Sequence, residues 1–326
     1  MDKLIASFTA QLREALQIGA SFNFQHEAKP VQHVVISGLG GSGIGASIVQ
    51  NYTSGNIKVP VIVNKNYFLP AFVNEHSLVI ISSYSGNTEE TIQAFKEAVR
   101  KKATVVCITS GGTIAREAGR KKLDCIIIPP GMPPRACLCY SFVQALYILN
   151  RYGLINKSFE KDLKKTIGLL DDNEKAIKDQ AKKMARKMNG KLPILYVDAH
   201  MEGVAVRWRQ QINENAKMLC WHNIVPEMNH NEIVGWKDKR DDCVVVFLRN
   251  ENDYERVQMR MEINKKMIRK CTSQVYEIWS KGSSYLEQAL YLVYIGDWLS
   301  WYLAVDHHVD ANEVAAIDFL KGELLR

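Results

Sequence analysis

Long apolar runs are missing from this sequence. Nowhere in its 326 residues does an apolar stretch reach the ~18 residues that a membrane-spanning helix needs. The N-terminus also lacks the cleavage pattern of a secretory signal peptide. Its apolar residues instead recur at the spacing of one face of an amphipathic helix, namely Leu4, Ile5, Phe8, Leu12, Ala15 and Leu16. We therefore expect a cytoplasmic protein that has no membrane partner.

The cysteines form no framework that would indicate disulfides or zinc. There are seven, an odd number spread through apparent strands and helices, and none occurs before Cys107. This distribution is typical of reduced thiols in a core. Cys137 and Cys139 are too close together to form half of a structural zinc site, and no second pair accompanies them.

Basic residues are in excess but do not gather into a patch. The formal net charge is +7 and falls on lysine-rich helical surfaces such as residues 161–191, without aromatic residues between the basic ones. Nucleic acid is therefore not an expected partner, whereas a small anionic substrate is weakly favoured. The hydrophobic fraction of 47% and the charged fraction of 24% are those of an ordinary globular protein.

Apolar strand-like runs alternate with helix-length segments, which predicts parallel sheets covered by helices. The strands expected in the first half are residues 33–37, 59–63, 78–82, 104–109 and 124–128. The second half is expected to hold strands at 192–197, 243–248 and 274–279, and helices at 159–188, 202–218, 254–270, 285–304 and 311–325. The predicted fold class is therefore α/β, with one domain over residues 1–152 and a second over 153–326.

A glycine-rich loop follows the first expected strand. Residues 38–46 read GLGGSGIGA and open a helix, the context in which a dinucleotide fingerprint occurs. Gly38, Gly40 and Gly43 fit that pattern, but residues 61–65 at the end of the second strand supply no acidic residue for a ribose. The alternative is a tight turn that lets a helix pack closely.

A run of hydroxyl side chains follows the third expected strand. Residues 82–91 read SSYSGNTEET, and a helix is expected to start near Thr88, capped by its side chain, with Glu89 and Glu90 in the first turn. Helix amides and hydroxyl donors bind an anion without lysine. Because parallel strands deliver both loops to the same edge of a sheet, they favour a sugar phosphate over a nucleotide. The alternative is that the hydroxyls only cap helices.

These loops resemble the sugar isomerase (SIS) domain. Later segments, PPGMPPRA at 129–136, NENAK at 213–217 and PEMNHNEIVGW at 226–236, resemble the bifunctional phosphoglucose/phosphomannose isomerases, and the likeness extends from about Ile36 to Lys321. The resemblance implies two SIS domains, each a flavodoxin-like αβα sandwich with a parallel sheet. It implies reversible isomerisation of glucose 6-phosphate to fructose 6-phosphate, with mannose 6-phosphate also accepted, as a step of glycolysis and gluconeogenesis without metal or organic cofactor.

The resemblance also implies which residues act. Glu214 matches the base that moves a proton between C1 and C2, and Arg135 matches the cation that stabilises the cis-enediolate. His230 and Lys321 match the pair that opens the sugar ring. In the family the histidine reaches the site from the partner subunit, which implies a homodimer. The residues expected to bind the substrate and its phosphate are Gly41, Ser42, Ser83, Ser85 and Thr88.

One position departs from the family pattern, and other functions remain open. Asn312 stands near the point where the family has a small hydroxyl residue that leaves room for the C2 epimer, so glucose 6-phosphate is the expected substrate before mannose 6-phosphate. A non-catalytic sugar-phosphate sensor and another SIS enzyme are the alternatives, although a sensor would be expected to lack Glu214 or Arg135. His307 and His308 are adjacent and point to different faces, which disfavours a metal site.

Overall fold

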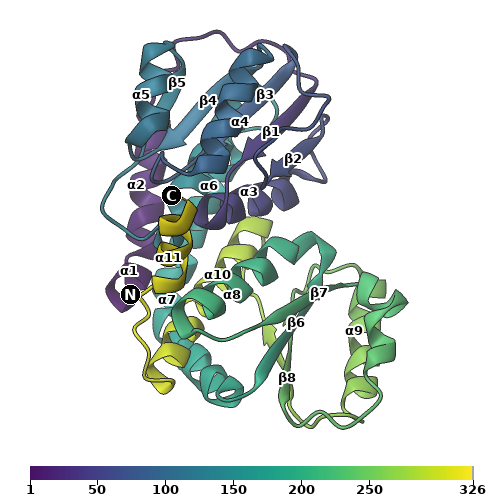
Figure 1. Ribbon diagram of the computed structural model, residues 1–326. Helices are drawn as coiled ribbons and strands as arrows, with labels where there is room; N and C mark the ends of the chain where they lie inside the picture. The colour runs from purple at the N-terminus through teal and green to yellow at the C-terminus, as the bar shows by residue number, and fades with distance from the viewer. Residues whose placement is uncertain (325–326) are drawn as a thin grey trace. The chain divides into compact units, whose positions relative to one another are not determined.

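The computed structural model describes residues 1–324, which divide into two compact units (Figure 1). The N-terminal unit comprises Ala6–Asp171 with Ser284–Glu287, and the C-terminal unit comprises Met1–Ile5, Asp172–Ser283 and the described residues from Gln288 onward. The change of unit falls inside helix α7 (Ser158–Met188). The boundary that we predicted at residues 152/153 lies just before this helix.

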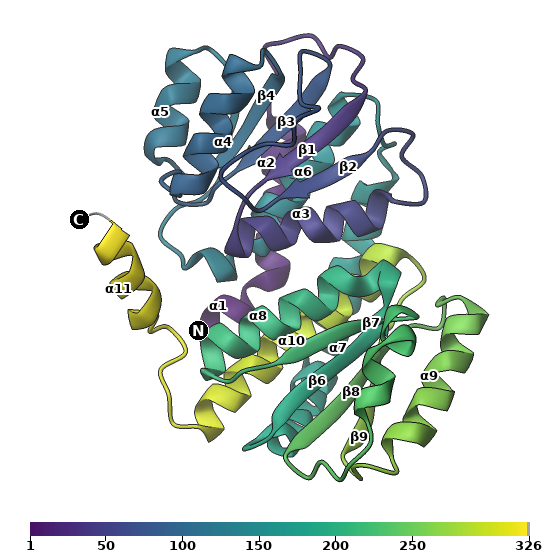
Figure 2. The same cartoon turned by 45° about the vertical axis from the view of Figure 1, so that its right-hand side comes forward.

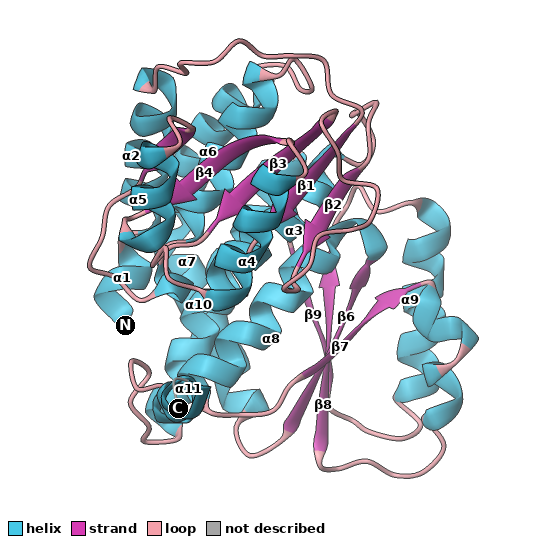
Figure 3. Ribbon diagram, turned by 45° about the horizontal axis from the view of Figure 1, so that its top comes forward, coloured by secondary structure: helices cyan, strands magenta, loops and turns pink. Residues whose placement is uncertain are grey.

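The N-terminal unit is built on a parallel sheet. Its strands are β1 (His33–Ser37), β2 (Val61–Asn64), β3 (Ser77–Ser82), β4 (Thr104–Thr109) and β5 (Asp124–Ile127). They lie in the order β2-β1-β3-β4-β5, which is the flavodoxin-like order (Figure 3). Both faces of β3 are buried, as its unbroken apolar run requires.

Helices cover both faces of this sheet. On one face α4 (Glu89–Arg100) and α5 (Gly112–Arg120) bury Phe95, Ala98 and Ile114 against the strands. On the other face lie α3 (Gly40–Thr53) and α6 (Leu138–Arg151), and α2 (Phe8–Ser21) packs on α6. The short helix α1 (Asp2–Ala6) precedes α2. This layering is the predicted αβα sandwich.

The C-terminal unit repeats the arrangement with a second parallel sheet. Its strands β6 (Leu192–Asp198), β7 (Trp221–Val225), β8 (Cys243–Arg249) and β9 (Val275–Trp279) lie in the order β7-β6-β8-β9. Helix α9 (Glu255–Ile268) covers one face, and α8 (Glu202–Ala216) and α10 (Tyr285–Asp306) lie on the other (Figure 2). The two helices approach closely at Gly296, where an added Cβ would stand 2.4 Å from Trp208 Nε1.

The expected elements are present, with one strand missed and one helix misplaced. Strand β7 was not predicted, because it is an edge strand in which His222 and Asn223 interrupt the apolar residues and only Val225 is buried. Helix α11 (Ala315–Leu324) begins later than the predicted Ala311, and Leu325 lies outside the described residues.

All seven cysteines are free thiols, as predicted. Among the described residues, no helix is both long enough and apolar enough to cross a membrane. The cytoplasmic setting stays a prediction.

Candidate active site

The hydroxyl loop lies at the carboxyl end of β3, between that strand and α4. Ser83 is buried, and its Oγ donates a hydrogen bond to Thr88 Oγ1 at 3.1 Å. The predicted cap is wrong: Thr88 occupies the N-cap position, but its side chain makes no capping hydrogen bond. Glu89 and Glu90 do lie in the first turn of α4, as expected. Because the Thr88 hydroxyl faces Ser83 instead, it does not satisfy the first-turn amides, which suits a site for an anion.

Gly111 and Gly112, which follow β4, pack against the hydroxyl loop. Gly86 has φ +67°, and a Cβ there would stand 1.9 Å from the carbonyl oxygen of Gly111. A Cβ at Gly112 would likewise stand 2.3 Å from the carbonyl oxygen of Ser85. The amide of Thr113 also donates to Asn87 Oδ1 at 3.0 Å. The two backbones therefore pack in direct contact, which only glycine permits at these positions.

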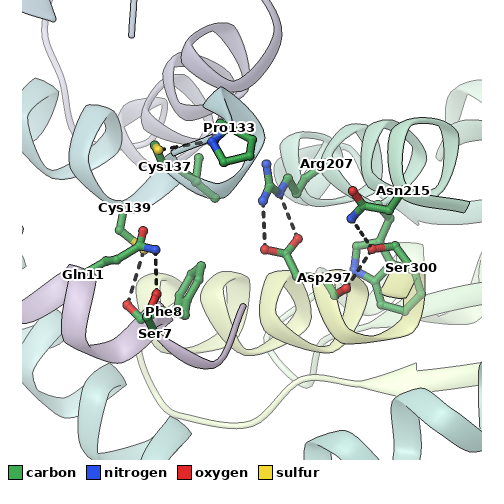
Figure 4. A network of polar contacts seen from close by, with 12 residues as sticks. Ser7, Phe8, Gln11, Pro133, Cys137, Cys139, Arg207, Asn215, Asp297 and Ser300 are labelled. Atoms are coloured by element: carbon green, nitrogen blue, oxygen red, sulfur yellow. Dashed lines mark hydrogen bonds and ion pairs between the residues drawn. The ribbon is translucent and has the colours of Figure 1, made fainter. Parts of the chain in front are cut away.

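Arg135 lies in a third loop at the same edge, after β5. It is 4% exposed and sits in the short 3₁₀ turn Pro134–Ala136 (η1). Cys137 Sγ donates to the carbonyl of Pro133 at 3.3 Å, which closes the turn (Figure 4). A Cβ at Gly41 would stand 2.4 Å from the carbonyl oxygen of Pro134, so the first turn of α3 packs against this backbone. The structure thus brings Gly41, Ser42, Ser83, Thr88 and Arg135 to one edge of the sheet, with Ser85 exposed in the same loop.

Glu214 lies near the end of α8 in the C-terminal unit, and it is partly exposed. The neighbouring Asn215 is fully buried, and its Nδ2 donates to Ser300 Oγ of α10 at 2.9 Å (Figure 4). About two turns of helix further back along α8, Arg207 and Asp297 form a two-hydrogen-bond ion pair at 3.0 and 2.8 Å, with side-chain exposures of 2% and 4%. These buried contacts fix the helix that presents Glu214.

Lys217 connects this helix end to the segment that precedes α11. Its Nζ donates to the carbonyl oxygens of Glu214, Asp310 and Glu313 at 2.7, 2.9 and 2.7 Å. Lys321 itself lies in α11, whose residues are all exposed. Lys217 was part of the NENAK motif, but its tethering role depends on the carbonyl groups of Asp310 and Glu313, about a hundred positions away in the chain, and is not visible in the sequence.

His230 lies at the opposite end of the second sheet from Glu214. Because β6 and β7 are parallel neighbours, α8 runs back between them, so its last turn is close to the start of β7. His230 follows the other end of β7, in the 3₁₀ turn Glu227–His230 (η3), and is exposed. The 5 residues of β7 span roughly 15 Å at ~3.3 Å per residue. Within one chain, these two predicted site residues are therefore not brought together.

The two sheets differ in charge at their carboxyl ends. Where β3 is followed by hydroxyls, the corresponding strand β8 is followed by Asp253, and β6 ends at Asp198. Both aspartates are 9% exposed. Burial and the negative charge of Asp198 raise the pKa of Asp253 to about 7, against the hydrogen bond from the Asn250 amide and the charge of Arg249. Negative charge on this carboxyl pair would disfavour a phosphate at the carboxyl end of the second sheet.

The raised pKa of Asp253 makes stability depend on pH. The folded state holds this proton up to about pH 7, whereas the ordinary pKa is 3.8, so the free energy of unfolding should fall as the pH rises through that window and level off above it. The loss is at most a few kcal/mol, at about 1.4 kcal/mol per pKa unit.

Asp253→Asn should reduce this dependence of the unfolding free energy on pH. All six tryptophans lie in the C-terminal unit, so denaturation followed by tryptophan fluorescence at pH 5 and pH 8 measures it. Equal slopes for the two proteins would contradict the assignment.

Metal-binding groups do not gather in the described residues. Within residues 1–324, no three or more His, Cys, Asp or Glu side chains are placed to hold a metal ion. His307 and His308, which follow the end of α10, belong to no such group. The metal-independent reaction expected from the family resemblance remains a prediction.

Comparison with known proteins defines the class first. Residues 29–150 match the SIS domain model, and residues 177–324 match the model described as "Bacterial phospho-glucose isomerase C-terminal SIS domain". The fold is also that of the C-terminal domain of glucosamine-fructose-6-phosphate aminotransferase from Francisella tularensis, with a TM-score of 0.79 at 13% identity, over 95% of this chain and 96% of that one. The chain is thus a protein with two SIS domains.

Sequence relatives define the family. The bifunctional phosphoglucose/phosphomannose isomerase of Caldicellulosiruptor bescii is 38% identical, over 99% of this chain and 98% of that protein. The protein of the same name from Aquifex aeolicus is 34% identical, over 90% of this chain and 91% of its own length. The chain belongs to the bifunctional phosphoglucose/phosphomannose isomerase family, which confirms the resemblance seen in the motifs.

Proposed function

We propose that the chain interconverts glucose 6-phosphate and fructose 6-phosphate, and also accepts mannose 6-phosphate, by proton transfer through a cis-enediolate. The observation that carries this proposal is the meeting of three loops, with Ser42, Ser83 and Arg135, at one edge of the first sheet in a member of this isomerase family. Hydroxyls and helix amides suit a phosphate dianion, and a buried guanidinium suits an oxyanion that develops nearby.

The loop of Ser83, Ser85 and Thr88, with help from Ser42, would hold the 6-phosphate and take no part in the proton transfer. Thr88→Val keeps the shape of the side chain and removes its hydroxyl. Since a hydrogen bond to a charged group is worth about 1.5–3 kcal/mol, we expect KM to rise about 10- to 100-fold with kcat nearly unchanged. Steady-state kinetics measures this change. Thr113→Val, at the start of the neighbouring helix α5, is the matched control and should change neither constant, because it keeps the backbone amide that bonds to Asn87. A fall in kcat alone would show that the loop does more than bind.

Glu214 would act as the single base that carries the proton between C1 and C2, and Arg135 would stabilise the negative charge of the enediolate. His230 and Lys321 would open the ring, by taking the proton of the C1 hydroxyl and supplying one to the ring oxygen. In this scheme, side chains of the protein itself would accept and donate every proton that is transferred.

We also infer that the working enzyme is a homodimer in which His230 completes the site of the partner subunit. Two observations support this inference. The first is the separation of Glu214 and His230 by the length of β7. The second is exposed apolar surface on the same segment, where Leu219, Trp221 and Val234 are 82%, 56% and 79% exposed. Large exposed apolar side chains around a functional residue favour an interface.

The function is tested by a coupled assay with glucose 6-phosphate and mannose 6-phosphate side by side, each with and without a chelator. We expect turnover of both sugars and no effect of the chelator. Asn312, the position that departs from the family pattern, lies in the loop before α11. Its backbone amide and Nδ2 both donate hydrogen bonds to Asp310 Oδ1, at 2.8 and 3.2 Å. Turnover of glucose 6-phosphate alone would restrict the proposal to one substrate. Turnover of neither would reject it and favour a sensor or another SIS enzyme.

A further inference from the structure

Tyr84 contacts all of the loops that meet at the edge of the first sheet. It follows Ser83 in the hydroxyl loop and is 9% exposed. Its amide donates to Ser42 Oγ at 3.2 Å, and its carbonyl oxygen accepts from the amide and hydroxyl of Ser110 at 2.9 and 2.6 Å. These backbone contacts tie the hydroxyl loop to the glycine loop and to the loop after β4. Its side chain is left to make a separate connection.

That connection reaches the loop of Arg135. The Tyr84 hydroxyl donates to the carbonyl of Pro129 at 2.9 Å and accepts from the amide of Met132 at 3.0 Å. The two bonds bridge a bend at Gly131, whose φ is +90°. Burial raises the pKa of this hydroxyl to about 12, so it remains a donor at any pH of interest. Arg135 follows Met132 in the next turn of the chain.

We propose that Tyr84 is a positioning residue, whose hydroxyl sets the place of Arg135 relative to the phosphate-binding loop. The inference rests on the proposed function, because it takes Arg135 to be the group that meets the enediolate. Gly41 packs against the same turn through backbone alone. The Tyr84 hydroxyl is therefore a side-chain link between the hydroxyl loop, which would hold the 6-phosphate, and the loop of Arg135, which would stabilise charge at C1 and C2. Such a link matters because a misplacement of ~1 Å at a reacting centre costs on the order of 10²-fold in rate.

The test is a double-mutant cycle between Tyr84→Phe and Arg135→Met. Tyr84→Phe removes one oxygen atom, and we expect kcat to fall about 10- to 100-fold while KM changes less than about 3-fold. In the Arg135→Met background, the same substitution should have almost no further effect on kcat, because the group that it positions is gone. An equal loss of kcat in both backgrounds would overturn the proposal.

A matched control separates this role from loss of a buried hydrogen bond in general. Tyr140 is 2% exposed in the same unit, and its hydroxyl bonds to Glu14, away from these loops. Tyr140→Phe should leave kcat and KM within about 2-fold of wild type. If it lowers kcat as Tyr84→Phe does, the effect is one of general stability and the proposal fails.

Binding of glucitol 6-phosphate, a hexitol phosphate that has no carbonyl group to isomerise, provides a readout that does not depend on turnover. Calorimetry should give the same affinity for wild type and Tyr84→Phe. Loss of binding would overturn the proposal, since Tyr84 would then support the phosphate loop itself. Failure of the proposed function is distinguishable, because it appears as an inactive wild-type protein, whereas failure of this inference appears only in the comparison between variants.

Discussion

Replacing Glu214 by glutamine should lower kcat by about 10²- to 10⁴-fold and leave KM within a few fold of wild type, the range that general base catalysis contributes. The amide has the shape of the carboxylate but cannot accept the proton from C2. The phosphate loop belongs to the other unit, so it keeps its hydrogen bonds in this variant. Steady-state kinetics with glucose 6-phosphate gives both constants.

A second readout follows the proton itself. In deuterated water, the wild-type enzyme should incorporate deuterium at C2 of glucose 6-phosphate during turnover. In Glu214→Gln, the rate of deuterium incorporation should not exceed the rate of turnover. Glu202→Gln, at the first residue of the same helix α8, is the matched control and should retain activity. Retained turnover in Glu214→Gln would remove Glu214 from the role of base, whatever the other residues do.

Mixing two inactive variants should restore activity if His230 completes the site of a partner. Glu214→Gln and His230→Gln each disable every site of a homodimer. In a mixed dimer, however, one site receives Glu214 from one chain and His230 from the other, while the second site receives neither. Random association of equal amounts with C₂ symmetry should therefore recover about a quarter of wild-type activity. The two variants are refolded together and assayed against the separately refolded proteins.

The control for this experiment pairs Glu214→Gln with the double variant Glu214→Gln/His230→Gln. No combination of these chains contains an intact Glu214, so the mixture should stay inactive. A mixture of the single variants that is no more active than its components would contradict the shared site. In that case, His230 would have to act in its own chain, despite lying beyond the far end of β7 from Glu214.

The sequence predicted the layers of the fold because the buried strands are almost wholly apolar. Strand β3 is buried at every position, and its run of Leu78, Val79, Ile80 and Ile81 is unmistakable. Strand β7 escaped prediction for the opposite reason. It lies at a sheet edge, where Trp221 and His222 face solvent in part and the apolar signal is lost. The apolar pattern of a short segment therefore indicates how deeply the segment is buried, and it fails to predict an element that is only half buried.

The candidate site was predicted less evenly than the fold. The hydroxyl loop and the glycine loop were expected at one edge of a sheet, and they lie there. The cap by Thr88 was wrong, because Ser83, five positions earlier, donates a hydrogen bond to the hydroxyl that was expected to cap the helix. A propensity for capping is a local preference, which a nearby side-chain partner overrides.

By itself, the sequence determined the two parallel sheets, the family, and the chemical groups available for isomerisation, since these follow from short segments whose apolar pattern or motif is complete in itself. The tertiary structure decided which groups meet. It set Glu214 and His230 at opposite ends of β7, gave Lys217 three carbonyl partners, and placed the Tyr84 hydroxyl on the loop of Arg135. The physical reason is that these contacts join residues up to about a hundred positions apart, and packing of whole elements, not local preference, brings such residues within hydrogen-bond distance.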